Sequence, residues 1–155
     1  MTTLDIADGD LRDPLMHFYL GLSAYPEVPE TLQRLKERGM KPAILSNGSP
    51  TMWASAVRNA GLDQVFDAVF SVDEVGVFKP HPSVYQLAIA RFNAVLEKIC
   101  FLSSNGWDAF SAKAFGFRVL WCNRFGQVPE RIPTVPDGEV ANLSGLPELF
   151  DICKN

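Results

Sequence analysis

Continuous apolar runs recur along this chain, and segments of helical spacing separate them. Ile99–Leu102 shows no alternation of apolar and polar positions, which is expected of a strand covered on both faces. Pro42–Leu45 is interpreted as a second short buried strand, and Ala68–Val72 and Arg118–Cys122 are predicted to be strands as well. The pattern therefore predicts four strands.

The segments between these runs carry apolar residues at helical spacing, and proline, serine or glycine marks several of their ends. Helices are predicted over Leu15–Leu22, from Pro29 to Gly39, from Pro50 to Gly61, over Ser83–Phe92, from Asp108 to Gly116, and over Leu146–Ile152. Residues 123–147 are rich in Pro and Gly and are expected to be mostly loop. Strands and helices that alternate in this way form βαβ units, so the predicted fold class is α/β, a Rossmann-like parallel sheet flanked by helices.

Polar side chains stand after the predicted strands or before the predicted helices. They form three groups, which are Ser46 with Asn47, Lys79 with Tyr85, and Ser103, Ser104 and Asn105 with Asp108. A parallel sheet brings such positions together at one edge, where ligands bind in open α/β sheets. The groups supply hydroxyls and amides for an anion, one cation and one carboxylate. This combination indicates a hydrolytic or transfer site, although the spacing alone does not name the reaction.

Length, charge and hydropathy narrow the possible partners. The chain has 155 residues, enough for one domain that buries ~70% of its unfolded surface. Its net charge is −4 and no Lys/Arg cluster is present, so nucleic acid is not expected as a partner. No apolar run approaches the ~18 residues of a membrane span, and the N-terminal sequence lacks a signal-peptide pattern, so no membrane partner is expected.

Cysteine and histidine usage indicates the compartment and argues against zinc. Cys100, Cys122 and Cys153 are odd in number and widely spaced, which favours free thiols in a reducing compartment, taken here as the cytoplasm. With His17 and His81 as the two histidines, the sequence shows no zinc cluster.

Three motifs carry a family resemblance. LSNGSP at 45–50, VFKPHPSVY at 77–85 and FLSSNGWDA at 101–109, in this order and spacing, resemble the haloacid dehalogenase superfamily, and within it the L-2-haloacid dehalogenase branch. The stretches AYPEVPETLQRLKERG and KAFGFRVLWCNRFG fit the same pattern, and the likeness runs from about Leu15 to the C-terminus. The resemblance implies a haloacid-dehalogenase-like core and a hydrolase of carbon–halide bonds that uses no metal and no cofactor.

The resemblance also implies a mechanism and four catalytic residues. In such enzymes an aspartate attacks C2 of a small 2-haloalkanoate, displaces halide with inversion, and forms an ester that water hydrolyses, so that L-2-haloacids become D-2-hydroxyacids. Lys79 would keep that aspartate ionised and in place, and Ser103 and Asn105 would position Lys79 and the acid. Asp108 would orient or activate the water.

Four further residues are implied to bind the substrate. Ser46 would hold the substrate carboxylate, and Asn47 would help to hold it and the departing halide. Tyr85 would line the site, and Trp107 would wall an apolar pocket. Each residue type also has a structural alternative, since hydroxyls cap helices, asparagines occupy turns and aromatic side chains fill cores.

The nucleophile motif of this family, an apolar strand followed by Asp-x-x-Gly-Thr-Leu, is not found in the sequence. In the faintly similar Asp8–Leu11 segment, the nucleophile position would fall on Ile6. The helical cap and its halide-binding arginine are also not found. Residues 1–155 are therefore expected to form a partial core, with 1–14 a remnant of the segment that returns from cap to core, and to be inactive alone.

The strand that carries the nucleophile is the central one in this superfamily, and it would lie between the Pro42–Leu45 and Ile99–Leu102 strands. Without it, both neighbours would expose unpaired edges, at ~1–3 kcal/mol for each unsatisfied buried group. We expect the chain alone to be unstable or to aggregate, unless the two strands close together or another chain lends a strand.

Alternatives remain open from the sequence. Magnesium-dependent phosphatases of the same superfamily usually place an aspartate where Ser104 stands, and a lone Asp108 makes a poor site for a hard cation. The metal-free dehalogenase is therefore preferred. The other alternative is a non-catalytic remnant that binds small carboxylates or a strand-donating partner, and a homodimer is also possible.

Overall fold

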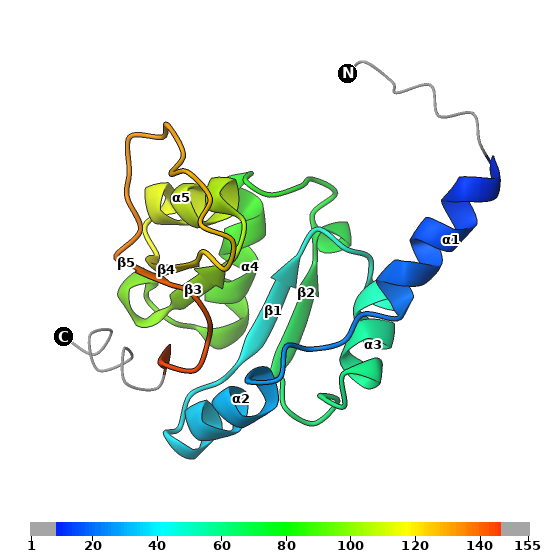
Figure 1. Cartoon of the computed structure of the whole chain (residues 1–155). Helices are drawn as coiled ribbons and strands as arrows, with labels where there is room; N and C mark the ends of the chain where they lie inside the picture. Colours follow the sequence, from blue (N-terminus) through cyan, green and yellow to red (C-terminus); the bar gives the residue numbers. More distant parts are fainter. Residues whose placement is uncertain (1–8, 147–155) are drawn as a thin grey trace.

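The computed structural model describes residues 9–146, in which helices and strands alternate (Figure 1). The helices are α1 (Gly9–Leu20), α2 (Val28–Glu37), α3 (Pro50–Asn59), α4 (Pro82–Phe92) and α5 (Gly106–Phe115). The strands are β1 (Ala43–Ser46), β2 (Ala68–Ser71), β3 (Cys100–Ser103), β4 (Arg118–Cys122) and β5 (Gly138–Val140), with two short 3-10 helices, η1 (Val72–Glu74) and η2 (Leu96–Lys98). The predicted α/β class is confirmed. Apart from Leu146, the helix predicted over Leu146–Ile152 lies outside the described residues, as does Cys153.

The strands form two parallel sheets rather than one. β1 pairs with β2, and β3, β4 and β5 pair in that order. Among the described residues no backbone pairing joins β1 to β3, and Figure 1 shows β1 on the side of its sheet nearer to β3. The interval between these two strands is where the family resemblance places a further strand.

The strands that border this interval are less buried than the sequence predicted. In β1, Ala43 is exposed and Ile44 and Leu45 are only half-buried, and of the four residues of β3 Phe101 alone is buried. The prediction that both are covered strands is therefore wrong for the described chain. The physical reason is that each sheet ends at one of these strands, so each has a neighbour on one side only.

Two strands are shifted by one residue from their predicted positions, and each ends on a serine. β1 and β3 each begin and end one residue later than predicted, because Ser46 continues the ladder opposite Ser71 and Ser103 continues it opposite Trp121. This shift puts both serines on the strands themselves, at the carboxyl ends. β4 has its predicted bounds.

Two elements differ more from the prediction. α1 begins at Gly9 rather than at Leu15, with Pro14 inside the helix, where proline would normally mark a start or a break. β5 falls within the stretch expected to be mostly loop, because a three-residue strand gives no apolar run. The position of β5 is set by its packing against β4. Gly138 lies opposite Leu120, so closely that a Cβ at position 138 would lie 2.9 Å from the leucine Cδ2.

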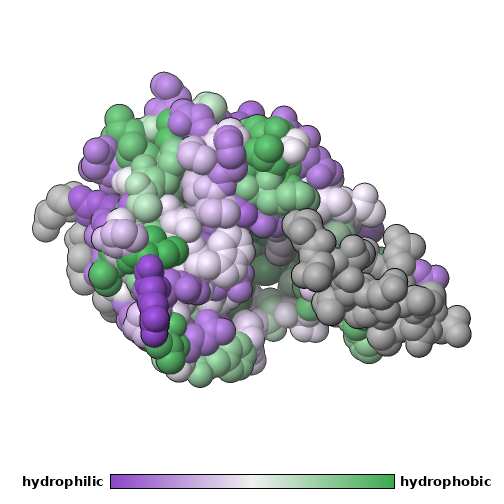
Figure 2. Space-filling model, turned by 90° about the horizontal axis from the view of Figure 1, so that it is seen from above, coloured by the Kyte–Doolittle hydropathy of each residue, from purple (hydrophilic) through white to green (hydrophobic). Residues whose placement is uncertain are grey.

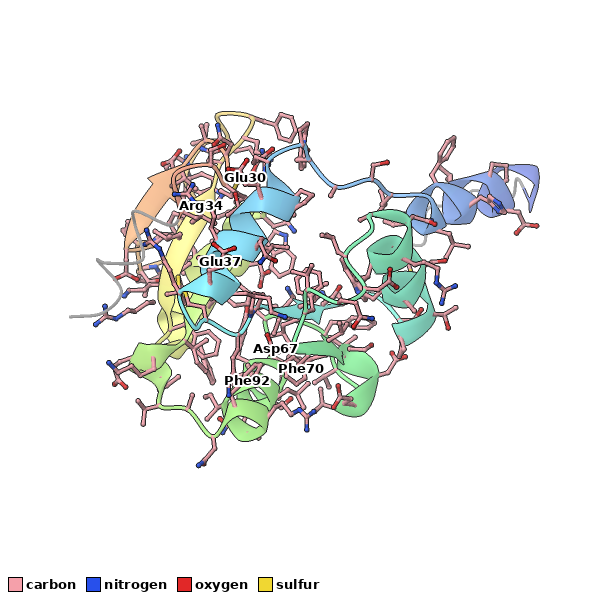
Figure 3. All side chains as sticks on the ribbon, turned by 90° about the horizontal axis from the view of Figure 1, so that it is seen from below. Glu30, Arg34, Glu37, Asp67, Phe70 and Phe92 are labelled. Carbon is pink, nitrogen blue, oxygen red and sulfur yellow. The ribbon has the colours of Figure 1, made fainter. Side chains whose placement is uncertain are left out.

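The core lies mainly around the larger sheet. One cluster centres on the buried aromatic residues Tyr85, Phe101, Phe110, Phe117 and Trp121, and a second joins α2 to β4 through Leu35, Leu120 and Leu146. Phe70 of β2 and Phe92 of α4 meet edge to face with centroids 6.1 Å apart (Figure 3). α4 therefore packs against both halves of the molecule.

The described surface is mixed in character. On the face seen in Figure 2, small hydrophobic areas alternate with hydrophilic ones. No helix within residues 9–146 is long and apolar enough to cross a membrane.

Candidate active site

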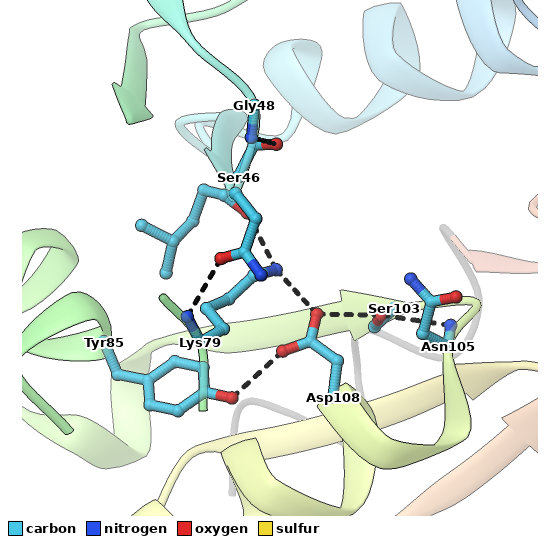
Figure 4. A network of polar contacts seen from close by, with 9 residues as sticks. Ser46, Gly48, Lys79, Tyr85, Ser103, Asn105 and Asp108 are labelled. Carbon is cyan, nitrogen blue, oxygen red and sulfur yellow. Dashed lines mark hydrogen bonds and ion pairs between the residues drawn. The ribbon is translucent and has the colours of Figure 1, made fainter. Parts of the chain in front are cut away.

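The predicted polar residues converge at the carboxyl ends of β1 and β3 (Figure 4). Ser46 ends β1, Ser103 ends β3, and Asp108 lies in the first turn of α5. Lys79 comes from the loop before α4 and reaches this edge with its side chain. Parallel pairing places the ends of neighbouring strands on the same side, which explains why residues distant in sequence meet here.

Asp108 is the centre of the network. Its carboxylate is 2% exposed and accepts three hydrogen bonds, from Lys79 Nζ at 2.7 Å, from Ser103 Oγ at 3.0 Å and from the Tyr85 hydroxyl at 3.0 Å. The first two bonds go to Oδ2 and the third to Oδ1. A buried carboxylate is tolerated when it is paired with a cation and well hydrogen-bonded, and this one is both.

Tyr85 reaches Asp108 from inside the hydrophobic core. Its side chain is 1% exposed, and its ring packs edge to face against Phe101 with centroids 5.7 Å apart. Burial, followed by the charge of Asp108 and the hydrogen bond to it, raises the pKa of the phenol far above its ordinary value. Tyr85 is therefore a permanent hydrogen-bond donor to Asp108.

Lys79 links the two sheets. Its Nζ donates to the Leu45 carbonyl of β1 at 3.1 Å and to Asp108 at 2.7 Å, and it lies 5.5 Å from the centroid of the Phe101 ring of β3. The side chain is 9% exposed. An ammonium group has three N–H donors, so two are used by these bonds and one is left for a ligand.

In the Ser46–Gly48 loop, two side-chain oxygens accept backbone N–H groups, and side-chain donors are left over. Ser46 Oγ accepts the Gly48 N–H at 2.9 Å, and Asn47 Oδ1 accepts the Lys79 backbone N–H at 2.9 Å. Within residues 9–146, the Ser46 O–H and the Asn47 side-chain NH₂ remain as donors. Together with the third N–H of Lys79, they favour an anion at this edge.

Two predicted residues take little part in the described network. Asn105 joins it through its backbone N–H, which donates to Ser103 Oγ at 3.2 Å, and its side chain is exposed (Figure 4). Trp107 is 38% exposed on the first turn of α5. The roles given to Asn105 and Trp107 stay predictions.

The sequence interpretation missed two contributors to the network. Ser71 donates from Oγ to the Gly48 carbonyl at 2.8 Å, and the Leu45 carbonyl accepts from Lys79. Ser71 directly follows apolar residues, as Ser46 does, so the same signal could have singled it out. The carbonyl carries no sequence signal, because every residue has one.

No group of three or more His, Cys, Asp or Glu side chains that could hold a metal ion is found in residues 9–146. The donor set at the site instead consists of hydroxyl, amide and ammonium groups. These groups suit an anionic ligand directly.

Comparison with known proteins shows the family. A family model described as haloacid dehalogenase-like hydrolase matches residues 5–116. The chain belongs to this family. Among its relatives, the (S)-2-haloacid dehalogenase of Pseudomonas sp. (strain YL) is 46% identical over 144 residues, which cover 93% of this chain and 62% of that protein. Haloacetate dehalogenase H-2 of Moraxella sp. (strain B) is 40% identical over 86% of this chain and 60% of its own length.

Solved structures place the chain in the L-2-haloacid dehalogenase branch. The L-2-haloacid dehalogenase of Xanthobacter autotrophicus, also solved with chloropropionic acid covalently bound, superposes with a TM-score of 0.85 at 35% identity, over 93% of this chain and 67% of that one. A HAD phosphatase of Thermococcus onnurineus is 26% identical with a TM-score of 0.72, over 82% of this chain and 58% of that one. The chain thus spans about three fifths of the length of the curated dehalogenases that it matches, at 62% for the Pseudomonas protein.

Proposed function

We propose that this chain supplies the lysine–aspartate part of an active site that hydrolyses L-2-haloacids to D-2-hydroxyacids. The observation that carries the proposal is the pairing of Lys79 Nζ with Asp108 at 2.7 Å beside leftover donors of the Ser46–Gly48 loop. Ser46 and Asn47 hold the substrate carboxylate, and Asn47 also receives the departing halide. Sequence identity of 46% to a (S)-2-haloacid dehalogenase supports the substrate class.

The chemistry proceeds in two steps. A carboxylate oxygen of the attacking aspartate forms a bond to C2, and the electron pair of the carbon–halogen bond leaves with the halide. Water then adds to the carboxyl carbon of the ester, the bond from that carbon to the ester oxygen breaks, and the hydroxyacid departs with the former aspartate oxygen, which gains the proton that water has lost to the general base. Asp108 is the general base: its Oδ1 accepts a hydrogen bond from this water and takes a proton from it. In the described network, the one protein donor to Oδ1 is the Tyr85 hydroxyl.

The attacking aspartate comes from a strand that pairs between β1 and β3. Each of the two half-buried strands that border the interval is paired on its other side only, which supports this placement, since an inserted parallel strand would cover Ile44 and Leu45 and satisfy backbone groups. The aspartate at its end would meet the remaining N–H of Lys79. On this basis the chain alone does not turn over 2-haloacids.

The test is halide release from L-2-chloropropionate. The full chain is assayed alone and after fusion to the stretch of the Pseudomonas sp. (strain YL) relative that this chain does not match. We expect release from the fusion and none from the chain alone. Lys79→Met in the fusion should abolish release, whereas Lys41→Met, a change at an exposed lysine, should leave it unchanged.

The outcomes separate the parts of the proposal. Release by the chain alone would overturn the assignment of the attacking group to another strand. A folded fusion without release would overturn the dehalogenase activity. The TM-score of 0.72 to a HAD phosphatase favours phosphate-ester hydrolysis as the second candidate, and turnover of p-nitrophenyl phosphate with Mg²⁺ by an otherwise inactive fusion would select it.

A further inference from the structure

Gly48 is held on three sides in the loop that presents Ser46 and Asn47. Its N–H donates to Ser46 Oγ at 2.9 Å, and its carbonyl accepts from Ser71 Oγ at 2.8 Å. The indole of Trp53 covers its Cα so closely that a Cβ at this position would lie 2.6 Å from Nε1. The loop conformation is therefore fixed by residues outside the loop as well as by the loop itself.

Ser71 has its hydroxyl hydrogen committed to this loop. It ends β2 directly opposite Ser46 and is 4% exposed. Its Oγ accepts the Asp73 N–H at 3.2 Å, and its own N–H donates to Glu74 Oε1 at 3.4 Å. These two bonds hold Ser71 from the side of η1, so its single O–H points at the Gly48 carbonyl.

The position of this loop determines where the leftover donors lie. If the Gly48 carbonyl moved, Ser46 Oγ would lose the N–H that it accepts, and its own hydrogen would no longer be directed outward. Asn47, the residue between them, would move as well, and it holds the backbone N–H of Lys79 at 2.9 Å. The hydrogen bond from Ser71 of β2 thus helps to fix the positions of the donors of Ser46 and Asn47 and of the Lys79 backbone.

We propose that Ser71 is a positioning residue of the candidate site, which fixes the Ser46–Gly48 loop so that its donors bind a substrate carboxylate. Ser71 does not touch the substrate. The inference rests on the proposed function for the identity of the ligand, and on the contacts of Gly48 for the action of Ser71.

The experiment uses the ¹⁵N-labelled full chain and three variants, Ser71→Ala, Ser71→Thr and Ser55→Ala. Threonine keeps a hydroxyl at the position, and Ser55 is a half-buried serine of α3 with no hydrogen bond of its side chain in the described part of the chain. Two quantities are measured by NMR. They are the Kd of propionate, from shifts of the Asn47 and Gly48 amides, and the hydrogen-exchange rate of the Gly48 amide without ligand.

We expect Ser71→Ala to raise the propionate Kd and the Gly48 exchange rate about fivefold, the effect of losing one hydrogen bond. Ser71→Thr and Ser55→Ala should stay within about twofold of wild type in both quantities. Faster exchange with an unchanged Kd would overturn the positioning role, because a merely structural bond gives that result. Unchanged exchange would overturn it as well.

Failure of the proposed function is distinguishable from failure of this inference. Absence of propionate-dependent shifts in the wild-type chain would contradict the carboxylate-binding function. The Gly48 exchange rate then tests only whether Ser71 fixes the Ser46–Gly48 loop, since acceleration confined to Ser71→Ala would support that contact, and equal rates in all variants would overturn it.

Discussion

Tyr85→Phe removes one hydroxyl from the centre of the candidate site and keeps the ring. The ring is 1% exposed and lies with its centroid 5.7 Å from Phe101, 5.2 Å from Phe115 and 5.9 Å from Phe117. Phenylalanine can keep these aromatic contacts. The substitution therefore isolates the 3.0 Å hydrogen bond from the hydroxyl to Asp108 Oδ1.

The magnitude follows from what Asp108 retains. Lys79 and Ser103 both donate to Oδ2, so the variant leaves Oδ1 of a buried carboxylate without its protein donor. A hydrogen bond to a charged group contributes ~1.5–3 kcal/mol, and removal of one oxygen atom adds little to the packing cost. We expect the free energy of unfolding to fall by ~1.5–3 kcal/mol.

The assay is urea unfolding of the full chain followed by tryptophan fluorescence. Tyr19→Phe is the matched control, because that tyrosine is 55% exposed, and it should change the free energy of unfolding by less than ~0.5 kcal/mol. A cycle with Asp108→Asn should give a coupling energy of ~1–3 kcal/mol between the two positions. A loss no larger than that of Tyr19→Phe, or a coupling near zero, would contradict a stabilising hydrogen bond from Tyr85 to Asp108.

Two other predictions concern the opposite end of the larger sheet. Burial alone would raise the pKa of Asp137, but hydrogen bonds, first of all from Lys113, outweigh it and lower the pKa below the ordinary 3.8. The stability this carboxylate contributes is present above the unfolded-state pKa and lost as pH falls through the folded-state pKa. Asp137→Asn should therefore destabilise the chain at pH 6 in unfolding experiments, and the difference should shrink as the pH falls through the lowered pKa of Asp137. Gly138→Ala places a methyl group 2.9 Å from Leu120 Cδ2 and should cost ~1–3 kcal/mol by urea unfolding. Gly145→Ala, which meets no atom of residues 9–146 within 4 Å, should cost less than ~0.5 kcal/mol, and equal effects of the two would contradict the packing argument.

Local sequence signals predicted most elements because those elements have local causes. Ser49 caps α3 by accepting the Met52 N–H, Pro50 occupies its first turn, and Gly116 ends α5 at a φ of +117°. β5 has no such local cause, because its place depends on contact with Leu120. Patterns within a segment therefore reveal helix ends and apolar strands, but not a strand defined by its neighbour.

The same distinction applies to the site. The meeting of Lys79 with Asp108 was predictable, because parallel strands must end on one side. The hydrogen-bond partners of individual atoms were not predictable. The bond from the Lys79 backbone N–H to Asn47 Oδ1, for example, spans 32 positions and depends on how two loops pack. The full burial of Tyr85 was likewise hidden, because an aromatic residue on a helix looks the same whether it lines a pocket or fills a core.

Lys79 couples the geometry of the site to the spacing of the two strands that border the interval. Its ammonium group is placed by the Leu45 carbonyl on one side of the interval and by Asp108 on the other. An increase in the spacing of β1 and β3 would therefore lengthen one of these bonds. A strand inserted between them would fix that spacing through two backbone ladders, and would at the same time bring its own end residue to the remaining N–H of Lys79. On the proposed function, binding of that strand therefore also brings the attacking aspartate to Lys79. A variant that weakens insertion of the strand should lose halide release and stability together.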